Sequence, residues 1–230
     1  MIDIDWKTAG SLFINGDCVE YMKTMPDKCV DLALVDPPYS INRFKNGETS
    51  RLRKYGQLNT ANNLRPDAEY INELFRVSKN QIVWGFNHLC DLLPPTSGFV
   101  FWFKHQPVIT YSDGELAWTS FSGIARCFDY PYFGCHGADV DRIHPTQKPI
   151  ALYTWLLQNY AHRGDKILDT HVGSASSLIA CHRMGFEYWG MELDADYFKA
   201  ATERLEREKA TTPLFEPQEI YKQEGLTFDA

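Results

Sequence analysis

A largely apolar run over residues 30–35 is followed at once by Asp36-Pro37-Pro38-Tyr39, and this junction constrains the fold more than any other segment. A run of this kind favours a buried β-strand. Proline cannot donate a backbone hydrogen bond to a sheet, so the two prolines end the strand. The junction predicts a strand end that presents a carboxylate, a fixed backbone carbonyl and an aromatic ring at one point. A plain strand-to-turn junction is the simpler interpretation of these residues alone.

The chain has 230 residues, 44% hydrophobic and 23% charged, which favours one α/β domain spanning residues 1–230. Its formal net charge of -7 gives no overall attraction to nucleic acid, so any such binding must use a local basic surface. The six cysteines show no C-x-x-C pair and no zinc-ligand spacing, which favours reduced thiols and no metal site. Without a leader pattern or a membrane-length apolar stretch, we expect a soluble, cytoplasmic protein and no membrane contact.

Apolar periodicity and turn residues predict strands that alternate with helices. In the first part of the chain, strands are expected at 11–15, 30–35, 81–86, 99–104 and 115–121, with helices at 19–25 and 67–79. Later elements are a helix at 149–161, a strand at 166–169, a helix ending near 185, a strand at 188–191 and a helix at 194–209. The segment 40–66 is predicted to be a long loop, which in compact domains is usually functional or disordered. Residues 123–142 are aromatic and turn-rich, and no element is predicted there.

Carboxylates follow several of the predicted strands. Asp17 and Asp36 each come just past a strand end, and open α/β sheets bind ligands at the carboxyl ends of their strands. Asp169 leads into a turn of small residues over 170–176, and Glu192 ends the next strand. An acidic residue at that place accepts hydrogen bonds from ribose hydroxyls in nucleotide-like sites, which indicates an adenosyl ligand. An ordinary strand-turn-helix unit with an exposed Glu192 is about equally favoured by these residues alone.

The turn after Asp169 lacks the G-x-G-x-x-G pattern that a pyrophosphate needs, because neither Thr170 nor Ala175 supplies a glycine. A ligand without phosphates fits better. S-adenosylmethionine keeps the ribose and adenine but carries a sulfonium and an amino acid end in place of phosphates. The segment His144-Pro145-Thr146-Gln147-Lys148-Pro149 offers a hydroxyl and an ammonium for a carboxylate ligand. A helix start with Pro149 at its first position is the simpler interpretation of that segment.

The tetrad at 36–39, the segment 144–149, the Asp169 turn and Glu192, in this order, resemble the beta class of S-adenosylmethionine-dependent DNA amino-methyltransferases. Asn15-Gly16-Asp17-Cys18 matches the opening motif of that family, and the resemblance covers about residues 12–205. It implies a three-layer, Rossmann-like methyltransferase fold, circularly permuted, with a mostly parallel seven-stranded sheet. The usual family loop is Asp-Pro-Phe-x-Gly-Ser-Gly, and this chain departs from it at Thr170, His171 and Ala175.

The resemblance also implies S-adenosylmethionine as the cofactor and a set of site residues. The implied catalytic residues are Asp36, Pro37, Pro38 and Tyr39. The implied cofactor-binding residues are Asp17, Cys18, Asp36, His144, Thr146, Lys148, Asp169, Gly173, Ser174 and Glu192. The roles implied within this set are adenine for Asp17, ribose for Glu192, the methionine moiety for Asp169 with Gly173, and its carboxylate for Thr146 with Lys148. Ala175 lacks the freedom of glycine at positive φ, so we expect a shifted loop.

The exocyclic amine of adenine or cytosine is a poor nucleophile because its lone pair is delocalised into the ring. The Asp36 carboxylate and the Pro37 carbonyl would accept both amine hydrogens and favour a pyramidal nitrogen. Tyr39 would stack on a base flipped out of the duplex. Asp at the first tetrad position is more usual for adenine enzymes of this family, so adenine N6 is favoured over cytosine N4. The same residues are also compatible with an RNA substrate, and with a catalytically inactive DNA-binding or partner module of the same fold.

Segments 40–66 and 105–142 are the candidate DNA-contacting insertions. In the first, the residues expected to contact phosphates are Arg43, Lys45, Arg51, Arg53 and Lys54. A solvated surface loop is an equally favoured interpretation of each of these positions. The resemblance also implies DNA as the partner, a role in DNA methylation such as restriction-modification, a nucleoid-associated location and a homodimer as one option.

Overall fold

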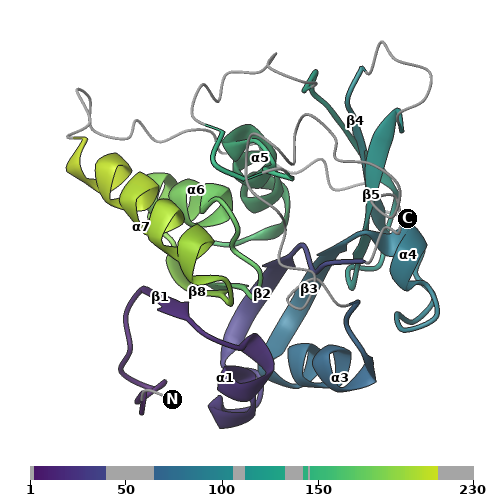
Figure 1. Ribbon diagram of the computed structural model, residues 1–230. Coiled ribbons are helices and arrows are strands. Elements are labelled where there is room, and N and C mark those ends of the chain that lie inside the picture. Colours follow the sequence, from purple (N-terminus) through teal and green to yellow (C-terminus); the bar gives the residue numbers. More distant parts are fainter. Residues whose placement is uncertain (1–2, 40–64, 106–111, 133–141, 145, 212–230) are drawn as a thin grey trace, which may run out of the picture.

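The computed structural model describes residues 3–39, 65–105, 112–132, 142–144 and 146–211 (Figure 1). Its strands are β1 (Leu12–Asn15), β2 (Val30–Val35), β3 (Ser78–Trp84), β4 (Phe99–Phe103), β5 (Gly114–Thr119), β6 (Arg126–Asp129), β7 (Lys166–Asp169) and β8 (Glu187–Glu192). Its helices are α1 (Cys18–Thr24), α3 (Ala68–Val77), α4 (Phe86–Leu89), α5 (Ile150–Tyr160), α6 (Ser176–Met184) and α7 (Ala195–Ala210). The strands form one sheet in the order β1-β8-β7-β2-β3-β5-β4-β6.

The sheet is mostly parallel, as predicted. β5 pairs antiparallel with β3 and with β4, whereas the other described pairings are parallel. β5 is therefore the only described strand that runs against the rest. The predicted number of seven strands is wrong, because the described residues form a sheet of eight. The unpredicted strand is β6, whose side chains are mostly exposed, so it leaves no clear apolar pattern in the sequence.

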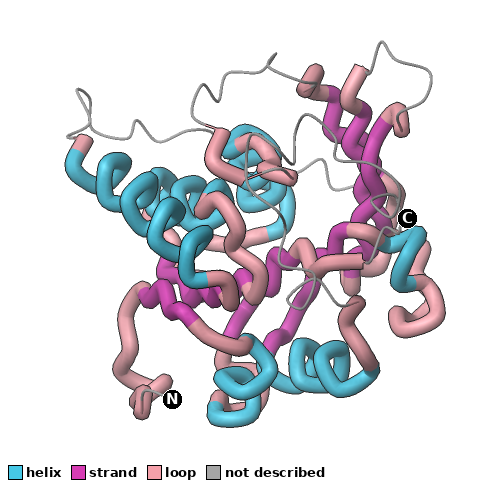
Figure 2. Tube along the Cα trace, in the orientation of Figure 1, coloured by secondary structure: helices cyan, strands magenta, loops and turns pink. Residues whose placement is uncertain are grey.

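Helices cover both faces of the sheet and give the three layers that the resemblance implied (Figures 1 and 2). In β2, Leu32 and Leu34 belong to the core beneath α5 and α6, whereas Ala33 and Val35 belong to the core beneath α1 and α3. A strand covered on both faces has a nearly continuous apolar sequence, which is the pattern that precedes the tetrad. Within the described residues, no helix is both long enough and apolar enough to cross a membrane.

The junction between α3 and β3 differs from the predicted boundaries. The helix predicted at 67–79 ends at Val77, and the strand predicted at 81–86 begins at Ser78 and ends at Trp84. No loop separates the two elements, because Ser78 caps the helix through its backbone N–H and its hydroxyl, both donated to the Leu74 carbonyl. Gly85 then ends β3 in the left-handed region, with φ at 78°.

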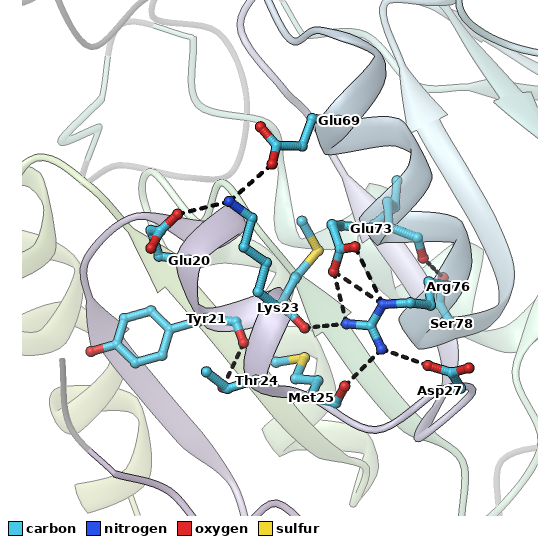
Figure 3. Close-up of polar contacts among 12 residues, drawn as sticks. Glu20, Tyr21, Lys23, Thr24, Met25, Asp27, Glu69, Glu73, Arg76 and Ser78 are labelled. Atoms are coloured by element: carbon cyan, nitrogen blue, oxygen red, sulfur yellow. Dashed lines mark hydrogen bonds and ion pairs between the residues drawn. The ribbon is translucent and has the colours of Figure 1, made fainter.

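Arg76, in the last turn of α3, ties this helix to the end of α1 (Figure 3). Its guanidinium donates to the carbonyls of Met25 at 2.8 Å and Met22 at 2.6 Å. It also pairs with Glu73 at 2.7 Å and Asp27 at 2.6 Å. The last carbonyls of a helix lack the usual intrahelical partner: the Met22 carbonyl accepts the Met25 N–H at 2.9 Å, and Arg76 adds a charged donor to it and to the Met25 carbonyl.

We expect Arg76→Ala to lower the free energy of unfolding by about 2–4 kcal/mol, because it removes the charged donor from the carbonyls of Met25 and Met22 and the cation that pairs with Glu73. Urea titration followed by circular dichroism measures the change. Arg163→Ala is the matched control, since that arginine is exposed in the turn between α5 and β7 and its loss is expected to cost under about 0.5 kcal/mol. Equal stability of the two variants would contradict the role given to Arg76.

Candidate active site

Four acidic side chains lie where parallel strands end. Asp17 follows β1, Asp36 follows β2, Asp169 ends β7 and Glu192 ends β8. Since these strands run in one direction, the structure places the four residues along a single edge of the sheet. Asp17 has a further local role there, because its carboxylate caps α1 by accepting from the Val19 N–H at 2.8 Å.

The two oxygens of Asp36 have different surroundings. Oδ2 is in contact with the Lys148 ammonium, in an ion pair that joins positions 112 residues apart. Oδ1 is buried and has no hydrogen-bond partner among the described residues. Burial raises the pKa of Asp36, and the charge of Lys148 opposes that rise. An unpaired buried acceptor costs stability in the free protein, so Oδ1 is available for a donor that a ligand brings.

The ring of Tyr39 is held against the start of α4. It stacks on His88 with 4.8 Å between ring centroids and 5° between ring planes. A Cβ atom at Gly85 would collide with the Tyr39 ring, so this approach requires glycine. Burial raises the pKa of Tyr39, which stays a neutral phenol. The packing fixes the ring beside Asp36 with one face covered by His88.

The turn after β7 meets Glu192 and His144. The Gly173 N–H donates to Glu192 Oε2 at 2.8 Å, and the Asp194 N–H donates to Oε1 at 2.9 Å. A Cβ atom at Gly173 would lie 3.7 Å from the His144 ring, so His144 reaches the turn. Ala175 adopts the left-handed conformation with φ at 64°, at a cost of about 1–2 kcal/mol relative to glycine. The alanine therefore holds a strained backbone conformation in this turn.

Thr170 and His171 form a hydrogen-bonded chain with Tyr70. The Thr170 hydroxyl lies 2.7 Å from the Tyr70 hydroxyl and 2.9 Å from His171 Nδ1. Burial lowers the pKa of His171 to about 4, so its imidazole is neutral near pH 7. These two departures from the family loop are therefore compatible with an ordered turn.

Asp169 is a buried carboxylate with two donors. It accepts from the His171 N–H at 3.0 Å and from the Ser177 hydroxyl. Burial raises the pKa of Asp169 to about 7, and the nearby charges of Asp36 and Glu192 add to this rise. Three carboxylates close enough to perturb one another favour a ligand that carries positive charge.

Lys148 lies against the tetrad. Its side chain is 4% exposed, and its ammonium contacts Asp36, lies 3.2 Å from Glu115 Oε2 and sits 5.3 Å from the centre of the Trp84 ring. Burial disfavours the charge on Lys148, but the carboxylates of Asp36 and Glu115 outweigh burial and raise its pKa well above the usual value. The role implied for Lys148, the cofactor carboxylate, stays a prediction.

The remaining predicted cofactor residues lie in or next to this region. Thr146 is exposed, with its hydroxyl 3.1 Å from His144 Nδ1, and burial lowers the pKa of His144 to about 4. Ser174 is buried, and its carbonyl accepts from Arg204 at 2.7 Å. Cys18 begins α1, and burial raises the pKa of its thiol to about 12, so it is a neutral neighbour of Asp17.

The predicted DNA contacts at positions 43, 45, 51, 53 and 54 lie outside the described residues. The segment 105–142 contains β5 and β6, so part of it belongs to the sheet. Five of the cysteines are described, and all five are free thiols. In the part of the chain that the structure describes, no group of three or more His, Cys, Asp or Glu side chains could hold a metal ion.

The region also contains residues that the sequence analysis did not predict. They are Gly85, His88, Lys104, Glu115 and Tyr70. Glu115 carried a weak signal, since it is a lone carboxylate at the start of a strand whose later residues are apolar and buried. His88 and Tyr70 carried none, because a ring on a helix is more often part of a core or surface than of a site.

Comparisons with known proteins agree with the fold and with the family that the sequence resembles. Residues 131–203 match the model of a family described as DNA methylase, named for N6 and N4 methyltransferases. YubD, a candidate methylase of Escherichia coli (strain K12), is 30% identical over 211 residues, which cover 85% of this chain and 90% of that protein. Type II methyltransferase M.HpaI of Haemophilus parainfluenzae is 22% identical over 246 residues, covering 85% of this chain and 74% of that protein.

Solved structures show the same fold. The M1.HpyAVI complex with SAM superposes with a TM-score of 0.57 at 19% identity, covering 84% of this chain and 98% of that chain. The cytosine-N4-specific PvuII DNA methyltransferase superposes with a TM-score of 0.60 at 14% identity, covering 88% and 91% of the two chains. At these identities the likeness establishes the architecture, so the chemistry must be argued from the side chains.

Proposed function

The chain belongs to the S-adenosylmethionine-dependent DNA amino-methyltransferases, and we propose that it methylates the N6 amine of an adenine flipped out of DNA. The observation that carries this proposal is the state of Asp36. Its Oδ1 is a buried acceptor with no partner among the described residues, beside a tyrosine ring, at the carboxyl edge of the sheet. An amine that donates two hydrogen bonds is the group that such an acceptor and a neighbouring proline carbonyl would bind.

S-adenosylmethionine is the cofactor, and the residues at the sheet edge fit it. Its sulfonium and ammonium would compensate the carboxylates that raise the pKa of Asp169. Glu192 and Gly173, which are joined by a hydrogen bond of 2.8 Å, would line the part of the site that holds the ribose and the methionine moiety. The cofactor supplies an electrophilic methyl group; the rest of the chemistry belongs to the protein side chains.

The protein residues would orient and activate the amine. Asp36 Oδ1 would accept one amine hydrogen and the Pro37 carbonyl the other, which favours a pyramidal nitrogen with a free lone pair. Proline at position 37 has no N–H that would compete for the same space. Tyr39, backed by His88, would stack on the flipped base with the face opposite His88. Transfer is direct, without a covalent bond between enzyme and base.

Cytosine N4 is the second candidate substrate. Its exocyclic amine offers the same two hydrogens to Asp36 and Pro37, and one structural relative is cytosine-N4-specific. Adenine is favoured because Asp rather than Ser begins the tetrad. A catalytically inactive DNA-binding module of the same fold is disfavoured by the presence of Asp36, Tyr39 and Glu192 together.

Mass spectrometry of nucleosides tests the function. Unmethylated duplex DNA of mixed sequence is incubated with the full chain and S-adenosylmethionine carrying a labelled methyl group. Labelled N6-methyladenine is the expected product, and labelled N4-methylcytosine would move the assignment to the second base. Absence of label on either base, with a thermal shift showing that the cofactor binds, would contradict DNA methylation and favour RNA or an inactive module.

Asp169 predicts how cofactor affinity changes with pH. With its pKa raised to about 7, Asp169 is mostly protonated at pH 6, and only its ionised form attracts the cofactor ammonium. Binding therefore releases a proton, and we expect the Kd to rise up to about tenfold as the pH falls from 7 to 6. Isothermal titration calorimetry in buffers of different ionisation enthalpy measures both the Kd and the proton. Asp169→Asn is the control, because it should bind more weakly and remove the pH dependence.

A further inference from the structure

Four charges of alternating sign, one buried and three partly buried, form a row that ends on Asp36. Lys148 contacts Asp36 Oδ2 and lies 3.2 Å from Glu115 Oε2, and Lys104 contacts Glu115 Oε1. The side chains of Asp36, Lys148, Glu115 and Lys104 are 17%, 4%, 27% and 16% exposed. They come from four places in the fold: the ends of β2 and β4, the start of β5, and the segment before α5.

The reversed direction of β5 is what brings Glu115 to this edge. In an antiparallel strand the first residues lie beside the last residues of its neighbours, and Glu115 is in register with Trp102 near the end of β4. Lys104 follows β4 and lies 4.3 Å from the centre of the Trp102 ring. Glu115 is therefore held at the edge that binds ligands although it begins its own strand.

Each charge in this row is set by its neighbours. Burial opposes ionisation of Glu115, but Lys148 and Lys104 lower its pKa to about 2, so it is fully charged. Lys148 is consequently shared between two carboxylates and makes contact with only one oxygen of Asp36. Without Glu115, Asp36 would be the remaining carboxylate in contact with the Lys148 ammonium among the described residues, and the repulsion by which Glu115 raises the pKa of Asp36 would be lost.

We propose that Glu115 is a positioning residue for methyl transfer, which holds Lys148 on Oδ2 of Asp36 so that Oδ1 stays free for the target amine. This inference rests on the proposed function and adds a residue to it. An ammonium that contacted both oxygens of Asp36 would leave neither for the amine, so an ammonium held between two carboxylates leaves Oδ1 able to accept.

Stability alone is a poor explanation of this row of charges. Removing several charged groups from water costs free energy that their mutual attraction seldom exceeds, and an apolar substitute of similar size is often as stable. Two carboxylate oxygens of the row are buried without a hydrogen bond among the described residues, and of these Glu115 Oε2 has the Lys148 ammonium at 3.2 Å, whereas no such contact is made by Asp36 Oδ1. A role in placing that oxygen accounts for charge at positions where an apolar side chain would fold as well.

Glu115→Gln tests the inference because it keeps the size of the side chain and removes the negative charge that attracts Lys148. The rate of methyl transfer is measured with enzyme in excess over DNA and saturating S-adenosylmethionine, and the Kd for S-adenosylmethionine is measured separately by calorimetry. We expect the rate to fall about 10- to 100-fold, since small misplacement of a reacting group has effects of this size. The Kd is expected to stay within about threefold, and Glu115→Asp should recover most of the rate.

Glu187→Gln is the matched control. Glu187 begins β8 at the opposite end of the sheet, is 60% exposed and pairs with Lys166 at 3.2 Å, so it also loses an ion pair but far from Asp36. If Glu115→Gln fails to fold, Lys104→Gln is the variant that tests the inference, because it removes the other ion-pair partner of Glu115. It is expected to slow methyl transfer about 3- to 10-fold.

The outcomes are separable. If the wild-type protein is active and Glu115→Gln transfers methyl groups at the wild-type rate, the role of Glu115 is overturned and the proposed function stands. If Glu115→Gln does not fold, a wild-type rate in Lys104→Gln has the same meaning. A weaker Kd with an unchanged rate would overturn it as well, and would place Lys148 on the cofactor carboxylate. Wild-type protein that labels neither base would overturn the proposed function together with this inference.

Discussion

Asp36→Asn is expected to slow methyl transfer by about 10²- to 10³-fold, the usual effect of removing one group that stabilises developing charge. Asparagine keeps an oxygen for the amine but removes the negative charge that makes Asp36 a strong acceptor beside Lys148. Cofactor binding should remain within about threefold, because Asp169 and Glu192 still line the edge. The rate is measured with labelled S-adenosylmethionine, and binding is measured by calorimetry.

Asp31→Asn is the matched control for this variant. Asp31 belongs to the same strand, near its beginning, where it pairs with Lys79 at 2.6 Å and accepts from the Lys166 N–H at 2.9 Å. Both variants lose one carboxylate in or next to β2 and one ion pair. A transfer rate in Asp36→Asn close to that of Asp31→Asn would remove Asp36 from the chemistry and return the tetrad to a plain strand-to-turn junction.

Glu192→Gln is expected to raise the Kd for S-adenosylmethionine about 10- to 100-fold. Both oxygens of Glu192 accept backbone N–H groups, from Gly173 at 2.8 Å and Asp194 at 2.9 Å. The amide of glutamine has only one acceptor, so one of these N–H groups would face another donor. Hydrogen bonds to a charged group contribute about 1.5–3 kcal/mol, and about 1.4 kcal/mol corresponds to a factor of ten in affinity.

Calorimetry measures this Kd, with Glu187→Gln at the other end of β8 as the control that should bind normally. The transfer rate of Glu192→Gln at saturating cofactor should stay within about threefold of the wild-type rate, because the contacts of Glu192 are with the turn after β7 and the start of α7 rather than with the tetrad. Unchanged affinity would show that Glu192 only shapes the turn. A slower rate at saturation would show that the turn also sets the position of the methyl group.

Local sequence was sufficient for the elements that carry most of the site. The apolar run before Asp36, the strand before Asp169 and the strand before Glu192 each end where their patterns predict. The carboxyl ends of parallel strands share one edge, so three acidic residues far apart in the chain could be placed together without coordinates. The three layers were implied by the family resemblance, and the apolar run of β2 agrees with them, because β2 is buried on both faces.

Other features depended on pairing between distant segments. β6 has mostly exposed side chains, so its pairing with β4 leaves no periodic signal. The stack of His88 on Tyr39 and the contact of Lys148 with Asp36 join residues that no local pattern relates. Their positions depend on how the helices pack on the sheet. That packing is determined by the burial of whole apolar faces of helices and sheet, and residues adjacent in sequence do not determine it.

The sequence by itself determined the order of strands and helices, the carboxylates at the strand ends and the family to which the chain belongs. Only the tertiary structure decided that β5 runs against the other described strands, and thereby that Glu115 shares Lys148 with Asp36. Strand direction is a choice between long-range hydrogen-bonded pairings, and nothing within residues 114–119 distinguishes the two directions. The charge of Asp36, the proposed acceptor, thus depends on Glu115, which lies beside it only in the folded chain.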